Sequence, residues 1–165
     1  MPVTVSIRER ICREVAAIMT ASGLFGTVRR WDTRGLSGLA RGDCIISDGE
    51  EKADDASIGN PGTTLKTMSL DVCASVAIDE STAEKASAIV NRTLALIEKA
   101  LMADPTLVET TTAVRLAVDT RCTGSGAVPV EEGQPEVYAI VGFEIQYEHD
   151  RNNPSVGPGI TEVTE

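Results

Sequence analysis

Aromatic residues are scarce in this chain of 165 residues, which has two Phe, two Tyr and one Trp. Base-stacking platforms and aromatic-lined ligand pockets need flat ring surfaces in numbers, so the composition disfavours both. No apolar run approaches the roughly 18 residues of a membrane-spanning helix, and the N-terminus lacks the apolar core and cleavage site of a secretory signal. We therefore expect a soluble protein that folds in a reducing cytoplasm and has no membrane partner.

Residues for catalysis and metal binding are equally few. His149 is the single histidine, and a solvated side chain is expected at the end of a predicted strand. The four cysteines include no C-x-x-C pair and are interpreted as buried thiols. The acidic stretch 43–55 lacks the oxygen spacing of a calcium loop. The sequence therefore predicts that the protein is not an enzyme, with no catalytic residue, no cofactor and no metal ion.

Positive charge is in deficit. Lys and Arg number 15 against 25 Asp and Glu, which gives a formal net charge of −10. This sign disfavours direct nucleic-acid recognition and anionic membranes. The charge is also uneven, because residues 1–41 carry +4 and residues 42–165 carry −14. Such a separation suits head-to-tail self-association.

Two amphipathic helices are predicted from their caps and apolar spacing. The first follows a capping box of Ser6 and Glu9, and the second follows a capping box of Ser81 and Glu84. An Asp-Pro pair at 104–105 ends the second helix. Each helix has one apolar face, so each must cover another element.

Strict alternation of apolar and polar residues predicts strands at 67–78, 108–119 and 137–147, with weaker signals at 27–32 and 43–47. Each long strand has one core face and one wetter face, as antiparallel strands do. We predict an α+β fold in which a single antiparallel-rich (mixed) β-sheet carries two α-helices packed on one face.

The organisation expected is one α+β domain over residues 1–148 and a flexible C-terminal tail over 149–165. Further loops are predicted at 48–66 and 121–136. The second face of the sheet is only half polar, which suggests a subunit partner there. Its small or apolar residues are Cys73, Ala77, Ala113, Ala117, Tyr138 and Ile140.

Arginines surround the single tryptophan, Trp31, and offer bidentate donors beside a large anchor of the kind that dominates interfaces. The alternative is an edge hairpin kept soluble by charge. The acidic loop is either solvated or a docking surface for a basic partner. Across these segments the candidate interface residues are Arg29, Arg30, Trp31, Arg34, Asp48, Glu50, Glu51, Asp54, Asp55, Tyr138, His149 and Arg151.

Taken in order over nearly the whole chain, the segments resemble the tail terminator, or tail completion, family of long-tailed bacteriophages. After the first helix comes Ile45-Ile46-Ser47-Asp48-Gly49-Glu50-Glu51, which resembles the strand and following acidic Asp-Gly-Glu-Glu segment of the family. The long helix closes on Ala100-Leu101-Met102-Ala103-Asp104-Pro105-Thr106-Leu107, and the last strand leads to Asn152-Asn153-Pro154. The chain departs from the family in Gly42-Asp43-Cys44, where many relatives carry Pro-Ala, and in its 17-residue tail.

This resemblance implies a structural virion protein that forms a hexameric ring on the head-proximal end of the tail tube. There it would stop tube polymerisation and provide the surface for head-tail joining. The implied partners are further copies of the chain, the tail tube protein, a head-tail connector or neck protein, and the sheath if the tail is contractile. The implied location is the neck end of the virion tail, with the host cytoplasm during assembly. The alternatives are another phage ring component, such as a head-tail connector or tube-like protein, and a small ligand-binding α+β domain.

Overall fold

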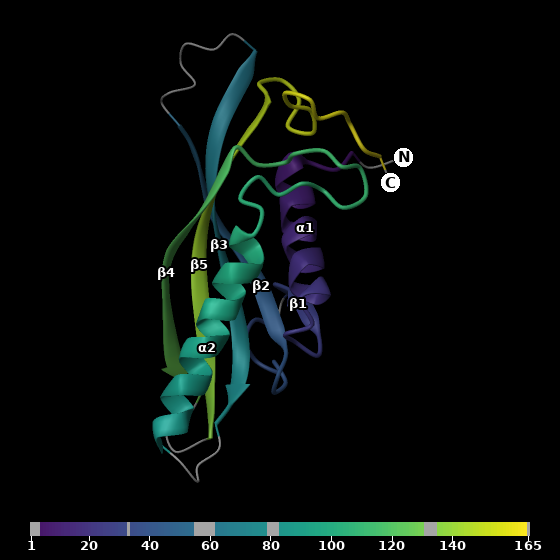
Figure 1. The fold of residues 1–165 in the computed structure, drawn as a ribbon. Coiled ribbons are helices and arrows are strands. Elements are labelled where there is room, and N and C mark those ends of the chain that lie inside the picture. The colour runs from purple at the N-terminus through teal and green to yellow at the C-terminus, as the bar shows by residue number, and fades with distance from the viewer. Residues whose placement is uncertain (1–3, 33, 55–61, 79–82, 131–134, 165) are drawn as a thin grey trace.

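The computed structural model describes residues 4–32, 34–54, 62–78, 83–130 and 135–164. One five-stranded sheet and two helices make up this part of the chain, which confirms the predicted α+β class (Figure 1). The elements are α1 (Ile7–Ala21), β1 (Val28–Arg30), β2 (Cys44–Ala53), β3 (Thr63–Ala77), α2 (Ala83–Met102), β4 (Asp119–Pro129) and β5 (Glu136–Asp150).

The sheet has the strand order β1-β2-β3-β5-β4 and is mixed, as predicted. β1 runs parallel to β2, and every other neighbouring pair is antiparallel. β3 and β5 form the centre and pair along their full length, from Thr63 with Asp150 to Ala77 with Glu136. Bulges interrupt β2 between Asp48 and Glu51 and β4 after Cys122.

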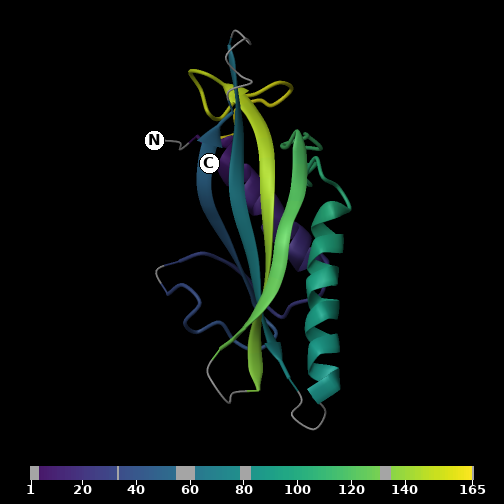
Figure 2. The ribbon, with the colours of Figure 1, turned by 90° about the vertical axis from the view of Figure 1, so that its left-hand side faces the viewer.

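Both helices lie on one face of the sheet, where they enclose the main core (Figures 1 and 2). α1 begins as expected, because the Ser6 side chain accepts a hydrogen bond from the backbone N–H of Glu9 at 3.2 Å. The predicted cap at Ser81 lies outside the described residues. Neither helix is both long and apolar enough to cross a membrane in the described part of the chain. Alternate strand residues face the helices, including Met68, Leu70, Val72, Val141, Phe143 and Ile145.

The opposite face of the sheet is partly covered by the chain's own loop between β1 and β2. Leu39 packs with Ile45 and Cys73 in a second buried cluster, and Leu36 and Tyr138 border it. The part of this apolar patch near Tyr138 is thus covered by an intramolecular contact, and the expectation of another subunit on this face stays a prediction. Further along the face towards β4, the surface is open.

The strand predicted at 108–119 is instead a connection between α2 and β4, with a single bridge between Val108 and Arg115. Val108 and Val118 are 41% and 52% exposed. The alternation was misleading because the stripe expected to face the core includes Thr110, whose hydroxyl donates to a carboxylate oxygen of Glu14 at 2.6 Å. Hydrogen bonds to side chains compete with strand pairing in this way.

Two predicted loops are largely strand. The segment 121–136 contains most of β4. Its glycines and Pro129 are typical of a turn, but β5 forms a ladder of hydrogen bonds with β4 and makes it a strand. The acidic residues 48–51 lie in β2 because β3 pairs with them up to Ala53. Local composition favours loops in both places, and pairing with a long neighbouring strand overrides it.

The tail expected to be flexible is packed against the N-terminal end of α1. Ile160 is 4% exposed and belongs to the main core. The backbone N–H groups of Val5 and Ile7 donate to the carbonyl oxygens of Val163 and Pro154, each at 3.0 Å. Aperiodic sequence does not signal such a segment, because its order comes from contacts with the rest of the chain rather than from local repeats.

Candidate functional site

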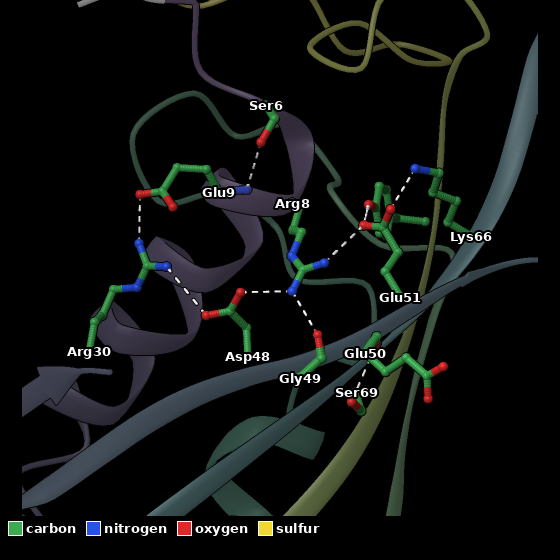
Figure 3. Close-up of polar contacts among 11 residues, drawn as sticks. Ser6, Arg8, Glu9, Arg30, Asp48, Gly49, Glu50, Glu51, Lys66 and Ser69 are labelled. Carbon is green, nitrogen blue, oxygen red and sulfur yellow. Dashed lines mark hydrogen bonds and ion pairs between the residues drawn. The ribbon is translucent and has the colours of Figure 1, made fainter. Parts of the chain in front are cut away.

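Several predicted interface residues lie in a polar network that joins α1 to the sheet. Arg8 extends from α1 over β2, where its guanidinium donates to Asp48 Oδ2 and to the Gly49 carbonyl oxygen, each at 2.8 Å (Figure 3). On the other side, Arg30 Nη1 lies 2.6 Å from Glu9 Oε1. Arg30 and Asp48 are about one-third exposed. Their charges therefore have partners within one protomer.

Glu51 continues this network towards the centre of the sheet. Its carboxylate accepts hydrogen bonds from the Lys66 ammonium and the Tyr147 hydroxyl. Burial raises the pKa of Glu51, but the hydrogen bonds from Lys66 and Tyr147 outweigh it and hold that pKa below its usual value. Burial and the neighbouring Glu51 carboxylate both raise the pKa of Tyr147. At neutral pH the pair is an ionised carboxylate and a neutral phenol.

A second polar cluster, unsuspected from the sequence, holds the connection after α2 against α1. Arg10 is 3% exposed and makes two hydrogen bonds to Glu109, at 2.9 Å and 2.7 Å. Glu14 is 5% exposed and accepts from the backbone and hydroxyl of Thr110. A signal was present, because Arg10 and Glu14 stand three residues after Ile7 and Ile11, on the buried stripe of the helix.

His149 is not the solvated strand-end residue expected. Its side chain is 6% exposed, Nδ1 lies 2.6 Å from the Asp150 carbonyl oxygen, and its ring centroid lies 6.3 Å from that of Tyr147. β5 extends through Asp150 and the following turn folds back, which buries the ring. Arg151 remains exposed. Of the acidic loop candidates, Asp54 and Glu50 are described and Asp55 lies outside the described residues.

Trp31 stands out as the described large hydrophobic residue with the most exposed side chain, at 54%. Its backbone N–H donates to the Ile46 carbonyl oxygen at 2.8 Å, which anchors it to the sheet. The indole rests against Gly35, where an added Cβ would lie 3.0 Å from ring carbon Cη2. Gly35 also has φ +54°, so this contact depends on glycine.

The arginines around Trp31 stabilise its loop. Arg29 donates to the carbonyl oxygens of Gly35 at 3.1 Å and Gly38 at 3.3 Å. Arg34 forms two hydrogen bonds to Asp32, at 3.0 Å and 2.6 Å, and its side chain is 65% exposed. The loop therefore presents the indole in a defined position with guanidinium groups beside it.

The two edges of the sheet differ. At the β1 edge, β1 has only three residues and the neighbouring β2 contains a bulge. The Gly49 carbonyl oxygen of β2 already accepts a hydrogen bond from Arg8. These are devices that protect an edge against pairing. On the β4 side, residues 123–129 are exposed, and no charged residue occurs from Cys122 to Val130.

A shallow hollow of about 390 Å³ lies on the outer face of the sheet beside this open edge. It is called the β4 hollow below, and its lining comprises Asp71, Thr123, Gly124, Ser125, Gly126, Ala127, Val128, Ile140 and Gly142. Val128 on its border is 51% exposed. An exposed strand edge without charged residues is open to contact with another chain.

Among the described residues, no group of three or more His, Cys, Asp or Glu is placed to hold a metal ion. Burial raises the pKa of the Cys12 and Cys73 thiols to about 11 and that of Cys44 to about 12, so these thiols stay protonated at neutral pH. The geometry therefore points to the exposed Trp31 and the β4 hollow as the candidate functional surfaces.

The comparisons with known proteins find likeness among solved structures. No family model matches the chain, and no curated protein matches it. Among solved structures, it is similar to a chain from the virion of a native gene transfer agent (GTA) particle, with 18% sequence identity and a TM-score of 0.41. The likeness covers 87% of this chain and 92% of that chain.

Proposed function

We propose that this chain is a non-enzymatic structural protein of a phage-like virion, which forms the ring that terminates the tail. In this role six copies cap the head-proximal end of the tail tube, stop its polymerisation and provide the surface for head-tail joining. The tail tube protein and a head-tail connector or neck protein are its partners. The proposal starts from the resemblance of the sequence to tail terminators.

One structural observation carries the proposal: the two edges of the sheet, at β1 and at β4, have different surfaces. Trp31 is exposed next to β1, whereas at the opposite edge the part of β4 from Cys122 to Pro129 carries no charge and borders an open hollow. Contacts between two different surfaces of the same protein are heterologous, and they generate rings when the rotation closes. A protomer of this kind supports assembly without any active site.

The two ends of the protomer also differ, which a cap requires. The segments 104–118 and 151–164 gather at the end that holds both termini, whereas the loop 34–43 lies towards the other end (Figures 1 and 2). A ring of parallel protomers would expose one set of loops on each face. One face can then bind the tube while the other does not accept a further tube ring.

The test is assembly and capping with the full chain. Light-scattering mass and electron micrographs of the purified protein should show closed rings, and adding it to polymerising tube protein of the same phage should shorten the tubes. A protein that stays monomeric at high concentration and leaves tube growth unchanged would contradict the proposal. Tubes made by the chain itself would indicate a tube-like protein, and binding to the capsid connector without an effect on tube growth would indicate a head-tail connector.

A further inference from the structure

We infer that Trp31 of one copy inserts into the β4 hollow of a second copy and forms the main contact between neighbouring subunits. The inference rests on the self-assembly proposed above and names the surfaces that carry it. Four observations support it: the fixed exposure of Trp31, the open space above two glycines of the hollow, the charges at both surfaces and their positions at opposite edges of the sheet.

Trp31 has the properties of an interface anchor. More than half of its side chain is exposed, yet the backbone bond to Ile46 and the contact with Gly35 fix its position. A rigid aromatic side chain loses little entropy on binding and buries a large area, which is why tryptophan is frequent among residues that dominate binding energy. An indole held out from the surface in this way matches a hollow on a partner.

Two of the three glycines that line the β4 hollow, Gly124 and Gly126, have no neighbour on the hollow side within the described part of the protomer. A Cβ added at Gly124 or Gly126 would have no neighbour within 4 Å among the described residues, and neither residue has a left-handed φ. Glycine in a strand lowers stability and marks places where another group comes close to the backbone. The open space above these two residues is therefore available to a side chain of another molecule.

The floor and border of the hollow suit a tryptophan flanked by arginine. Ile140 provides an apolar surface for the ring, and Asp71 lies at the border. Asp71 is exposed, and no cation is paired with it in the part of the chain that the structure describes. Arg34 beside Trp31 uses Nε and Nη2 to bind Asp32, but its side chain is 65% exposed, so its remaining N–H groups are available for this carboxylate. Opposite charges at the border of a contact fix its orientation and speed its formation.

A second copy fits this hollow because the chain cannot fill it with its own Trp31. β1 and β4 are the two edges of a five-stranded sheet, about 19 Å apart at the usual strand spacing. Each copy therefore presents the indole at one edge and an empty hollow at the other. Contacts of this type repeat head to tail rather than stopping at a dimer, and they form a ring when the rotation between copies closes.

The experiment compares the assembly of full-length variants by light scattering and sedimentation. Trp31→Ala removes the inserted ring, and Gly126→Leu adds an apolar side chain to the hollow at a position where an added Cβ has no neighbour within 4 Å. Ala88→Leu is the matched control, because it adds a similar apolar group on the exposed surface of α2. We expect both test variants to weaken subunit association on the order of 30-fold or more. The control should assemble like the wild type, and all three should keep the wild-type circular dichroism spectrum.

A charge exchange tests the contact independently of these variants. Arg34→Asp and Asp71→Arg should each weaken assembly, and the double variant should regain part of the loss if the two residues face each other across the interface. If the wild type assembles while Trp31→Ala and Gly126→Leu assemble equally well, the inference is overturned and the proposed function stands. If the wild type never assembles, the proposed function fails and this inference fails with it.

Discussion

Arg10 and Glu109 form a two-point ion pair across 99 residues of sequence, with Nε–Oε1 at 2.9 Å and Nη2–Oε2 at 2.7 Å. Arg10 also donates to the carbonyl oxygen of Thr161 at 2.9 Å. One side chain on α1 thus joins the connection after α2 to the C-terminal segment. Because Arg10 is almost fully buried, the charges are shielded from water and depend on each other.

The first prediction concerns this pair. Replacing Arg10 by Ala should lower the free energy of unfolding by about 3–5 kcal/mol, because Glu109 would keep a partly buried charge without its partner. Arg121→Ala is the control, since Arg121 is 69% exposed and its pair with Asp119 is worth at most about 1 kcal/mol. Urea unfolding followed by circular dichroism measures both. Equal losses for the two variants would contradict a special role for Arg10.

The second prediction concerns acid. The hydrogen bond from Arg10 holds the pKa of Glu109 below its usual 4.5, and the balance of contacts at Glu51 lowers its pKa as well. A carboxyl group with a lowered folded-state pKa stabilises the protein above the unfolded-state pKa, and this contribution is lost as the pH falls below it. Stability should therefore be constant near neutral pH and fall from about pH 5 downwards.

The measurement is the urea midpoint across the range from neutral to about pH 3, for wild type and Arg10→Ala. In the variant, Glu109 loses the Arg10 side chain that lowers its pKa. The stability of the variant should therefore depend less on pH in the acidic range. A wild-type midpoint that does not change across this range would exclude these carboxylates as contributors to stability.

The third prediction concerns the C-terminal segment. Ile160→Ala should destabilise the protein by about 2–4 kcal/mol, because Ile160 is buried in the main core. Thr161→Ala is the neighbouring control, since its side chain is exposed and only its backbone oxygen holds Arg10. Thermal unfolding compares the two. A neutral Ile160→Ala variant would mean that residues 151–164 do not contribute to the folded core.

The fourth prediction concerns the thiols. Cys12, Cys44 and Cys73 are buried and burial raises the pKa of each, whereas Cys122 is partly exposed. At pH 8 a disulfide reagent should therefore modify Cys122 first and the other three only as fast as the protein opens. Mass spectrometry of peptides after short labelling identifies the modified residue. Rapid labelling of Cys12 or Cys44 would contradict the buried positions of these side chains.

The sequence predicted the parts of the fold that rest on local signals. The capping box at Ser6 located the start of α1. Period-two alternation located β3 and β5, because each of these strands has one face in the core. β4 was missed because Gly124 and Gly126 provide no apolar pattern, so only its pairing with β5 makes it a strand. Pairing across the sheet depends on the whole fold and leaves no trace in a short window.

In the candidate site, too, the sequence could predict only those features that have a local signal. Trp31 was identified because a single large aromatic residue among arginines is conspicuous in any sequence. The β4 hollow could not be found in this way, since it exists only where β4, β5 and β3 bring small residues together. Arg30, Asp48 and Glu51 were suitable interface residues by composition, but in the structure α1 supplies partners for their charges.

The central pairing of β3 with β5 also determines how the chain reaches its fold. Thr63 pairs with Asp150, 87 residues further along, and α2 and β4 lie between the two strands. Loop closure over such a distance must precede the ladder that stabilises it, which slows folding relative to helical proteins of this size. A growing chain cannot complete the sheet until its last strand has been made, so β3 keeps a free edge from the time it is made until β5 follows, and that edge is exposed to aggregation.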